Sequence, residues 1–537
     1  MRKRQAKLVN FHEPGSALAG GAVSHYDSAV TGLVVWRAGE RTMSVLRRVI
    51  IAVAGSVGAL FGAAAAFLIA GLNTPALLAG ALVGGLVYGS LWWQQGQLSG
   101  QDRRWQTRRL GLALLALPVI LAAAFAGGTL YALYNAGQIL VPTDDRPANF
   151  DRLWVAVRDN YPYFDIKDVD WNAVGARYRP LVAAASTDEE YHALVAELLF
   201  ELQDGHSFLA HPHPAESWRF GTLADVDGQA VIAALDDVAR AAGLARGDVV
   251  TAVDGRSLDD AIAALHPTLR VASTPWGRRW WGLQNLLVAW DGARELAVTV
   301  RSADGDTRTV TLAVPEAAPA AGDPGPLVMG HALPSGTGVI RIPTFGGNRQ
   351  TLVAEFDAAL DALMDAPALI FDVRGNGGGN SLTASEMAGR LLADTFEYAY
   401  ECYPQRLPAH MWLGCSARVV YPRAPRYDGP VVALIDAGTG SSAEEFVLML
   451  VESGRGLTAG RTSGGTTGNP LAFSLTGDAN VRFSNGDLRR MDGQRLESAG
   501  ITPDAPVSWT VEDWRAGRDP DIAAAEQLLA ALTSGSG

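Results

Sequence analysis

The sequence Gly-Ser-Ser-Ala-Glu-Glu-Phe at residues 440–446 stands between an apolar run at residues 431–435 and a helical pattern at residues 443–452. The apolar run predicts a buried strand. A serine on such a strand-to-helix turn is exposed, and the free amides at the start of the helix lie beside it. Those amides and the positive end of the helix dipole stabilise an oxyanion in acyl transfer. The stretch therefore predicts a nucleophilic serine in an α/β fold.

The same serines also have a purely structural interpretation. Ser441 with Glu444, or Ser442 with Glu445, has the spacing of a capping box, in which a serine side chain binds free amides of the first helical turn. Capping alone would explain a serine at this position. The sequence leaves both interpretations open.

Predicted strands and helices alternate around this stretch. Such alternation indicates an α/β core. The predicted strands are residues 338–342, 368–373 and 430–435, and the predicted helices are residues 352–364, 382–392 and 443–452.

A glycine-rich turn follows the second of these strands. Residues 372–379 read Asp-Val-Arg-Gly-Asn-Gly-Gly-Gly. Because glycine has no side chain, such a turn can bring bare backbone amides against a substrate. A dinucleotide-binding fingerprint is excluded, since Asn380 stands where its third glycine is required. A plain tight turn is the alternative.

A histidine turn supplies the predicted base. Residues 187–203 form an apolar helical stripe that ends at an Asp-Gly pair, so that His206 falls on the following turn. A serine hydroxyl needs a base at neutral pH. The only lysines are Lys3, Lys7 and Lys167, and none lies near the serine in sequence. We therefore expect a histidine base, and we expect replacement of Lys167 by arginine to leave turnover nearly unchanged.

A metal site is the alternative use of this segment. His206, His211 and His213 have no spacing typical of a zinc-binding helix, and no carboxylate partner stands beside them. The sequence therefore predicts no metal and no cofactor.

Residues 218–315 show short strands separated by turns. Within them, residues 243–255 place an apolar strand between glycine turns. This run resembles part of a PDZ domain, a module that captures an extended peptide or a chain terminus on a strand edge. An unrelated small β-domain is the alternative, and the sequence leaves both open.

Three apolar stretches in the first third of the chain predict membrane spans. Residues 49–70, 75–93 and 110–133 carry almost no charge and have the length, about 20 residues, that a helix needs to cross a bilayer. Residues 1–48 hold eight Arg or Lys residues and the loop after the second stretch holds four arginines, whereas the first loop has none. Since positive flanks stay in the cytoplasm, everything after the third span is predicted to lie outside it.

The net charge of the chain indicates which class of partner it does not bind. The formal net charge is −12 and the isoelectric point is about 5.3, which argues against a nucleic-acid binder.

Cys402 and Cys415 fall in the part that is predicted to face outward, where an oxidising compartment permits a disulfide. Two free thiols are the alternative.

The order of these features resembles the C-terminal processing (tail-specific) serine protease family, and its tricorn-core-like branch in particular. The resemblance covers residues 148–510 and is most specific at residues 372–379 and 440–446. It implies a crotonase-like protease core and a polypeptide substrate. In the lysine-dependent branch a lysine follows the nucleophile, and Thr466 occupies its place here. The resemblance therefore excludes that serine–lysine dyad.

By position, the tricorn-like branch implies His206 as base, Ser441 as nucleophile and Glu497 as the accompanying carboxylate. Ser441 is preferred to Ser442 because it keeps the family's spacing to the start of the helix. One departure is Gly205, which stands where tricorn has a serine before the histidine. The connection from histidine to glutamate is therefore expected to differ.

The resemblance also implies an oxyanion hole and a domain plan. The oxyanion hole would consist of the amide of Gly377 or Gly378 together with that of Ser442. The plan is a multi-domain chain with a cytoplasmic segment (1–48), three transmembrane helices (49–135), a helical protease subdomain (148–212), a PDZ-like β-rich domain (217–315), a linker (316–326), an α/β catalytic core (327–518) and a C-terminal helix and tail (519–537).

Together these features predict a membrane-anchored serine endopeptidase with its site outside the cytoplasm. The alternative is a catalytically inactive, PDZ-containing peptide-binding or scaffold protein that keeps the fold. The sequence does not indicate the oligomeric state.

Overall fold

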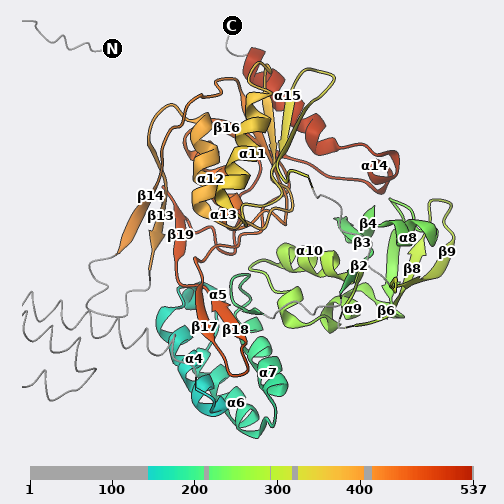
Figure 1. Cartoon of the computed structure of the whole chain (residues 1–537), viewed down its shortest axis with the longest axis vertical. Coiled ribbons are helices and arrows are strands. Elements are labelled where there is room, and N and C mark those ends of the chain that lie inside the picture. The colour runs from blue at the N-terminus through green and yellow to red at the C-terminus, as the bar shows by residue number, and fades with distance from the viewer. Residues whose placement is uncertain (1–142, 211–216, 291, 317–324, 404–413, 535–537) are drawn as a thin grey trace, which may run out of the picture. The chain divides into compact units, whose positions relative to one another are not determined.

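The computed structural model describes residues 143–210, 217–290, 292–316, 325–403 and 414–534 (Figure 1). The three predicted membrane spans lie outside these residues. Within the described ranges, no helix is both long enough and apolar enough to cross a membrane.

A helical lobe begins the described part of the chain. Its core also contains a small antiparallel sheet, to which the C-terminal half of the chain contributes two strands (Figure 1). Buried Phe473, Val481 and Phe483 of those strands pack among the apolar side chains of the helices. The elements are α4 (Arg146–Asn160), α5 (Phe164–Lys167), α6 (Trp171–Ala184), α7 (Asp188–Phe200), β1 (Phe208–Ala210), β17 (Leu471–Ser474) and β18 (Asn480–Phe483).

A β-rich domain follows, as the sequence predicts. Its main strands pair in the order β3-β4-β5-β8-β9, each antiparallel to its neighbours. The predicted strand between glycine turns is β5, and it pairs with β4 on one side and β8 on the other. The elements are β3 (Gly221–Val226), β4 (Gln229–Leu235), α8 (Asp237–Ala241), β5 (Val249–Val253), α9 (Leu258–Ala264), α10 (Pro275–Leu286), β8 (Glu295–Arg301) and β9 (Thr307–Ala313).

The α/β core is built on a mainly parallel sheet. The strand order is β10-β11-β12-β15-β16-β20, and only β10 at the edge runs antiparallel to its neighbour. The strands are β10 (Met329–Ala332), β11 (Gly338–Arg341), β12 (Leu369–Asp372), β15 (Val431–Ile435), β16 (Gly456–Gly460) and β20 (Ala505–Pro506).

Helices cover both faces of this sheet, which is why its central strands β12 and β15 are buried and largely apolar. Alternate residues point to opposite faces: Phe371 lies in the cluster formed with α11, α12 and α13, whereas Ile370 lies in the cluster formed with α15. The helices are α11 (Arg349–Asp361), α12 (Ser381–Ala388), α13 (Ser442–Glu452) and α15 (Pro520–Ser534).

The parallel order of β12 and β15 positions the site. The glycine-rich turn follows β12 and the serine turn follows β15, and these strands are hydrogen-bonded neighbours. The carboxyl ends of parallel strands meet at one edge of the sheet, where ligands bind in such folds. The two turns therefore lie side by side.

A further antiparallel sheet flanks this edge. Strand β13 (Phe396–Cys402) pairs with β14 (Cys415–Val420) and with β19 (Asp487–Arg490). Cys402 and Cys415 lie directly opposite each other in the β13–β14 register and form a disulfide. Of the two alternatives that the sequence left open, the structure has the bridge.

Candidate active site

Ser441 lies on a strained turn between β15 and α13. Its φ of 55° and ψ of −127° place it in a region that residues with a side chain rarely adopt. Such a conformation costs on the order of 1–3 kcal/mol and persists where the surroundings enforce it. Here the Ser441 N–H donates to the Thr466 carbonyl at 2.8 Å. The turn has the geometry of a nucleophile elbow.

The capping interpretation of the two serines is wrong. Ser441 occupies the N-cap position of α13, but its side chain makes no capping hydrogen bond. The Ser442 hydroxyl donates instead to the Gly379 carbonyl at 3.1 Å. Glu444 is fully buried and accepts the N–H groups of Gly465 at 2.8 Å and Thr466 at 3.0 Å. This carboxylate holds the segment that in turn holds Ser441.

His206 contacts the Ser441 side chain. Its Nε2 lies 3.1 Å from Ser441 Oγ, although the two residues come from different lobes and are 235 positions apart. Buried Asp204 fixes the histidine turn, because its carboxylate accepts the His206 N–H at 2.9 Å and the Ser207 hydroxyl at 2.8 Å. The predicted base and the predicted nucleophile are therefore within hydrogen-bond distance.

The environment of His206 lowers its pKa. Burial is the largest cause, and the nearby Asp204 carboxylate and a backbone hydrogen bond with Thr467 oppose it. A lowered pKa keeps the imidazole neutral at physiological pH, which is the form that accepts a proton. His211 and His213 lie outside the described residues.

Glu497 lies at the site but is not joined directly to the histidine. Its Oε2 accepts the Thr467 N–H at 2.9 Å, and the residue is 2% exposed. Within the described ranges, Glu497 forms neither a hydrogen bond nor an ion pair with His206, and His206 Nδ1 is buried without a well-formed hydrogen bond. Burial raises the pKa of Glu497 to about 8, with a further contribution from Asp204. Glu497 is thus connected to His206 only indirectly, because the Thr467 backbone that it binds also forms a hydrogen bond with His206.

The departure at Gly205 fits this indirect arrangement. A Cβ atom at position 205 would lie 2.6 Å from Cγ2 of Thr466. The Thr466 side chain therefore fills the space into which a serine at this position would project. As expected from the sequence, the connection between His206 and Glu497 is not made by a serine side chain at position 205.

Lys167 makes a contact at the site that its position in the sequence does not indicate, and the expected effect of Lys167→Arg on turnover stays a prediction. Its Nζ lies 2.7 Å from Glu497 Oε1, and the two side chains are 5% and 0% exposed. Some 330 residues separate the pair in sequence, so that no local pattern indicates the contact. Lys167 is a buried cation beside the predicted catalytic carboxylate.

The glycine-rich turn packs against the nucleophile. The Gly378 N–H donates to Oδ1 of Asn376 at 2.9 Å, so it is engaged in this structure. In the described part of the chain, the amides of Gly377 and Ser442 make no hydrogen bond. Of the two glycines predicted for an oxyanion hole, the structure therefore favours Gly377, together with the amide of Ser442.

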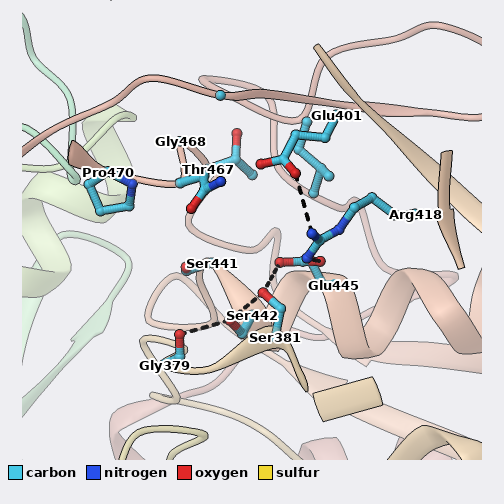
Figure 2. Close-up of a pocket in the computed structure, with 13 residues that line it drawn as sticks. Gly379, Ser381, Glu401, Arg418, Ser441, Ser442, Glu445, Thr467, Gly468 and Pro470 are labelled. Carbon is cyan, nitrogen blue, oxygen red and sulfur yellow. Dashed lines mark hydrogen bonds and ion pairs between the residues drawn. The ribbon is translucent and has the colours of Figure 1, made fainter. Parts of the chain in front are cut away.

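A polar pocket that is partly open to solvent adjoins Ser441 (Figure 2). The Arg418 guanidinium lies between two carboxylates, 3.0 Å from Glu445 and 3.3 Å from Glu401. Arg418 is 31% exposed, whereas each carboxylate is only 10% exposed. Ser381 also lines the pocket and contacts Glu445.

Comparison with known proteins relates two parts of the chain to protease families. Residues 336–507 match the model of peptidase family S41, and residues 142–200 match the tricorn protease C1 domain. Together these matches cover less than half of the chain. The matches support a serine peptidase, in agreement with the resemblance noted in the sequence.

Two curated relatives come from Streptomyces coelicolor. Tricorn protease homolog 2 is 27% identical over 402 residues, and tricorn protease homolog 1 is 25% identical over 435 residues. These alignments cover 68% and 74% of this chain, but only 30% and 36% of the relatives. The chain thus spans about a third of the length of each.

A solved structure shares the fold. Mature CPAF in complex with lactacystin superposes with a TM-score of 0.57 at 15% identity, over 72% of this chain and 97% of that one. At this identity the similarity establishes the fold alone. It agrees with an S41 protease fold that carries a helical and a β-rich domain.

Four residues at the site were not predicted from the sequence: Lys167, Arg418, Glu444 and Thr467. Glu444 has the spacing of a helix cap, but a carboxylate in an apolar helical pattern also signals a buried, hydrogen-bonded group. Lys167 and Arg418 carry no local signal, because their partners lie on distant segments.

We expect Gly378→Ala to impair catalysis strongly. Gly378 has a φ of +98°, and a Cβ there would lie 2.6 Å from Cβ of Ser441 and 2.8 Å from the Ser442 nitrogen. The added methyl group must displace the nucleophile, and small misplacements in a site cost about 100-fold. Gly493→Ala is the matched control, since Gly493 has a φ of +88° but no atom within 4 Å of its Cβ position. Equal kcat values in the two variants would contradict the prediction.

Proposed function

We propose that this chain is a membrane-anchored serine endopeptidase that cleaves extracytoplasmic proteins or peptides. Ser441 is the nucleophile, His206 is the general base, and Glu497 supports the base through Thr467. The observation that carries the proposal is the 3.1 Å approach of His206 Nε2 to a serine in a strained elbow conformation.

The chemistry follows from this geometry. Ser441 Oγ attacks the carbonyl carbon of the peptide bond while His206 Nε2 takes the hydroxyl proton. The carbonyl oxygen becomes an oxyanion, which the amides of Gly377 and Ser442 stabilise. The C–N bond then breaks, His206 gives its proton to the leaving amine, and an acyl-enzyme remains. Water, activated by the same histidine, releases the second product.

The pocket beside Ser441 would receive a part of the substrate adjoining the scissile bond. Its charged groups are already compensated, because the Arg418 guanidinium pairs with Glu401 and Glu445. A compensated polar lining suits polar side chains and peptide backbone better than a large apolar side chain. No metal or organic group takes part in the proposed reaction.

The β-rich domain is proposed to present the polypeptide, as a PDZ-like module would. Helix α10 of this domain reaches the glycine turn: the position of a Gly377 Cβ lies 3.6 Å from Trp281, which is 39% exposed. Trp280 packs edge-to-face against Trp281. A peptide held on this domain would therefore lie near the proposed oxyanion hole.

Placement outside the cytoplasm rests on the arginine asymmetry of residues 1–135, and the Cys402–Cys415 disulfide agrees with an oxidising compartment. A reporter that is active only in the cytoplasm should be active when fused after Arg108 and silent when fused after Asp151. Activity at both fusion points would contradict the topology. The reporter activity of each fusion is measured in whole cells, and immunoblots confirm that both fusions are expressed.

Purified full-length chain in detergent tests the endopeptidase activity. A mixed library of internally quenched peptides, analysed by mass spectrometry, should yield products from cleavage of internal peptide bonds. The rival function, an inactive peptide-binding or scaffold protein, predicts that the same peptides bind without being cleaved. Retained binding without cleavage across pH 5–9 would favour the rival.

A further inference from the structure

We propose that Lys167 is a positioning residue of this site: its ammonium pairs with Glu497 and holds that carboxylate against the Thr467 amide, beside His206. The inference rests on the proposed function. It adds a residue that neither the resemblance nor the family matches assign.

The contacts of Lys167 are those of a fixed, buried cation. Lys167 is the last residue of α5, and its Nζ lies 2.7 Å from Glu497 Oε1. The same Nζ donates to the carbonyl of Gln203 at 2.8 Å and approaches that of Ser273 at 3.4 Å. An ammonium has three donors, and these three acceptors account for them. A charge that is 95% buried needs such compensation.

Glu497 in turn fixes the segment that contacts both reacting residues, Ser441 and His206. Its Oε2 accepts the Thr467 N–H at 2.9 Å, while Glu444 accepts the preceding amide, that of Thr466, at 3.0 Å. The Thr466 carbonyl in turn accepts the Ser441 N–H at 2.8 Å. Two buried carboxylates thus fix two consecutive amides. Only one of these carboxylates, Glu497, has a cationic partner in the described part of the chain.

The charge on Glu497 depends on the groups that surround it. Burial and the Asp204 carboxylate raise its pKa, and Lys167 and Ser273 lower it. Tyr161 and Tyr163 also face it, and they are buried and neutral, since their own pKa values are raised well above the usual range. Lys167 is therefore the only cation acting on this carboxylate among the groups that the structure describes as facing it. An ionised carboxylate binds an amide more strongly than a neutral one.

We expect Lys167→Met to lower kcat/KM by roughly 10- to 100-fold, the equivalent of a hydrogen bond to a charged group. The pH profile should also change. Activity that requires ionised Glu497 rises with pH, and loss of the cation should move this rise upward by about 1–3 pH units. Lys167→Arg keeps the charge and should restore the wild-type profile at an intermediate rate. A purely structural role would lower the rate equally at every pH.

Two further variants separate the charge effect from misfolding. Glu497→Gln should abolish the Glu497-dependent rise, and adding Lys167→Met to it should change kcat/KM less than about twofold, because the partner is already gone. Because the double variant removes both buried charges together, it leaves no uncompensated charge in the core and should fold. Arg177→Met is the control for loss of one positive charge: its pair with Glu201 is exposed, and we expect a wild-type rate.

The full-length chain in detergent is assayed against one quenched peptide from pH 5 to 10, with circular dichroism to establish folding. A wild-type profile in folded Lys167→Met, or an equal loss at every pH, would overturn the inference. So would a large further loss on adding Lys167→Met to Glu497→Gln. If the wild-type chain neither cleaves peptide nor reacts with a fluorophosphonate at Ser441, the proposed function itself fails.

Discussion

Ser441→Ala is expected to lower kcat by roughly 10^4- to 10^6-fold, the range found when the nucleophile of a serine peptidase is removed. The reason is geometric, since Ser441 Oγ is the hydroxyl that lies 3.1 Å from His206 Nε2. The substitution removes one oxygen atom from a half-buried side chain and should leave the fold intact. Steady-state hydrolysis of a quenched peptide, together with thermal unfolding, measures both effects.

Ser442→Ala is the matched control for this substitution. The Ser442 hydroxyl is buried and bonds the Gly379 carbonyl, whereas its amide, which the alanine variant keeps, is the proposed oxyanion donor. Ser442→Ala should therefore retain measurable turnover, with some loss of stability. The reverse ranking of the two variants would reassign the nucleophile.

His206→Ala is expected to cause a loss of similar size, roughly 10^4- to 10^6-fold in kcat, because the serine then has no base. The histidine must be neutral to accept the proton, so kcat/KM should fall as the pH drops through the pKa of His206. Burial lowers that pKa, which places the acid limb below the usual histidine value of about 6.5. A second rise at higher pH belongs to Glu497, whose pKa is raised to about 8.

The pH profile of kcat/KM, measured from pH 4 to 9, checks this assignment. His331→Ala is the control, since His331 lies on the exposed edge strand β10. It should reproduce the wild-type profile. Full activity in folded His206→Ala, or a wild-type profile in which no rise of kcat/KM falls below pH 6.5, would show that another group is the base.

The α/β core could be predicted from sequence because its physical signal is local. Strands β12 and β15 are buried on both faces, so β15 is an unbroken apolar run and β12 is apolar up to Asp372. The glycine turn and the serine elbow directly follow these runs. Once the strands are recognised as parallel neighbours, the proximity of the two turns follows.

The helical lobe and the base network could not be predicted in full, because their contacts join distant segments. Strand β18 pairs with β1, which lies more than 260 residues earlier in the chain. The composition of neither strand indicates which strand it pairs with. The Lys167–Glu497 pair likewise has no local pattern. Lys167 is far from the site residues in sequence but contacts Glu497 in space, whereas the order of motifs shared with the protease family correctly placed His206 beside Ser441.

The resemblance supplied what the residues alone could not. Glu497 has no local sequence signal and was named only by position in the family. The structure buries it near the site, yet it contacts Thr467 instead of His206. The resemblance therefore located the carboxylate, and the geometry changes the way in which it is proposed to act.

The most direct test of the central claim is the site of covalent labelling by a fluorophosphonate, which reacts with activated serines. Full-length chain in detergent is treated with the probe, digested, and mapped by tandem mass spectrometry. We predict one adduct on Ser441, still formed in Ser442→Ala, strongly reduced in His206→Ala and absent in Ser441→Ala. An adduct on another serine, or a folded wild-type chain that does not react, would contradict the claim that Ser441 is the activated nucleophile.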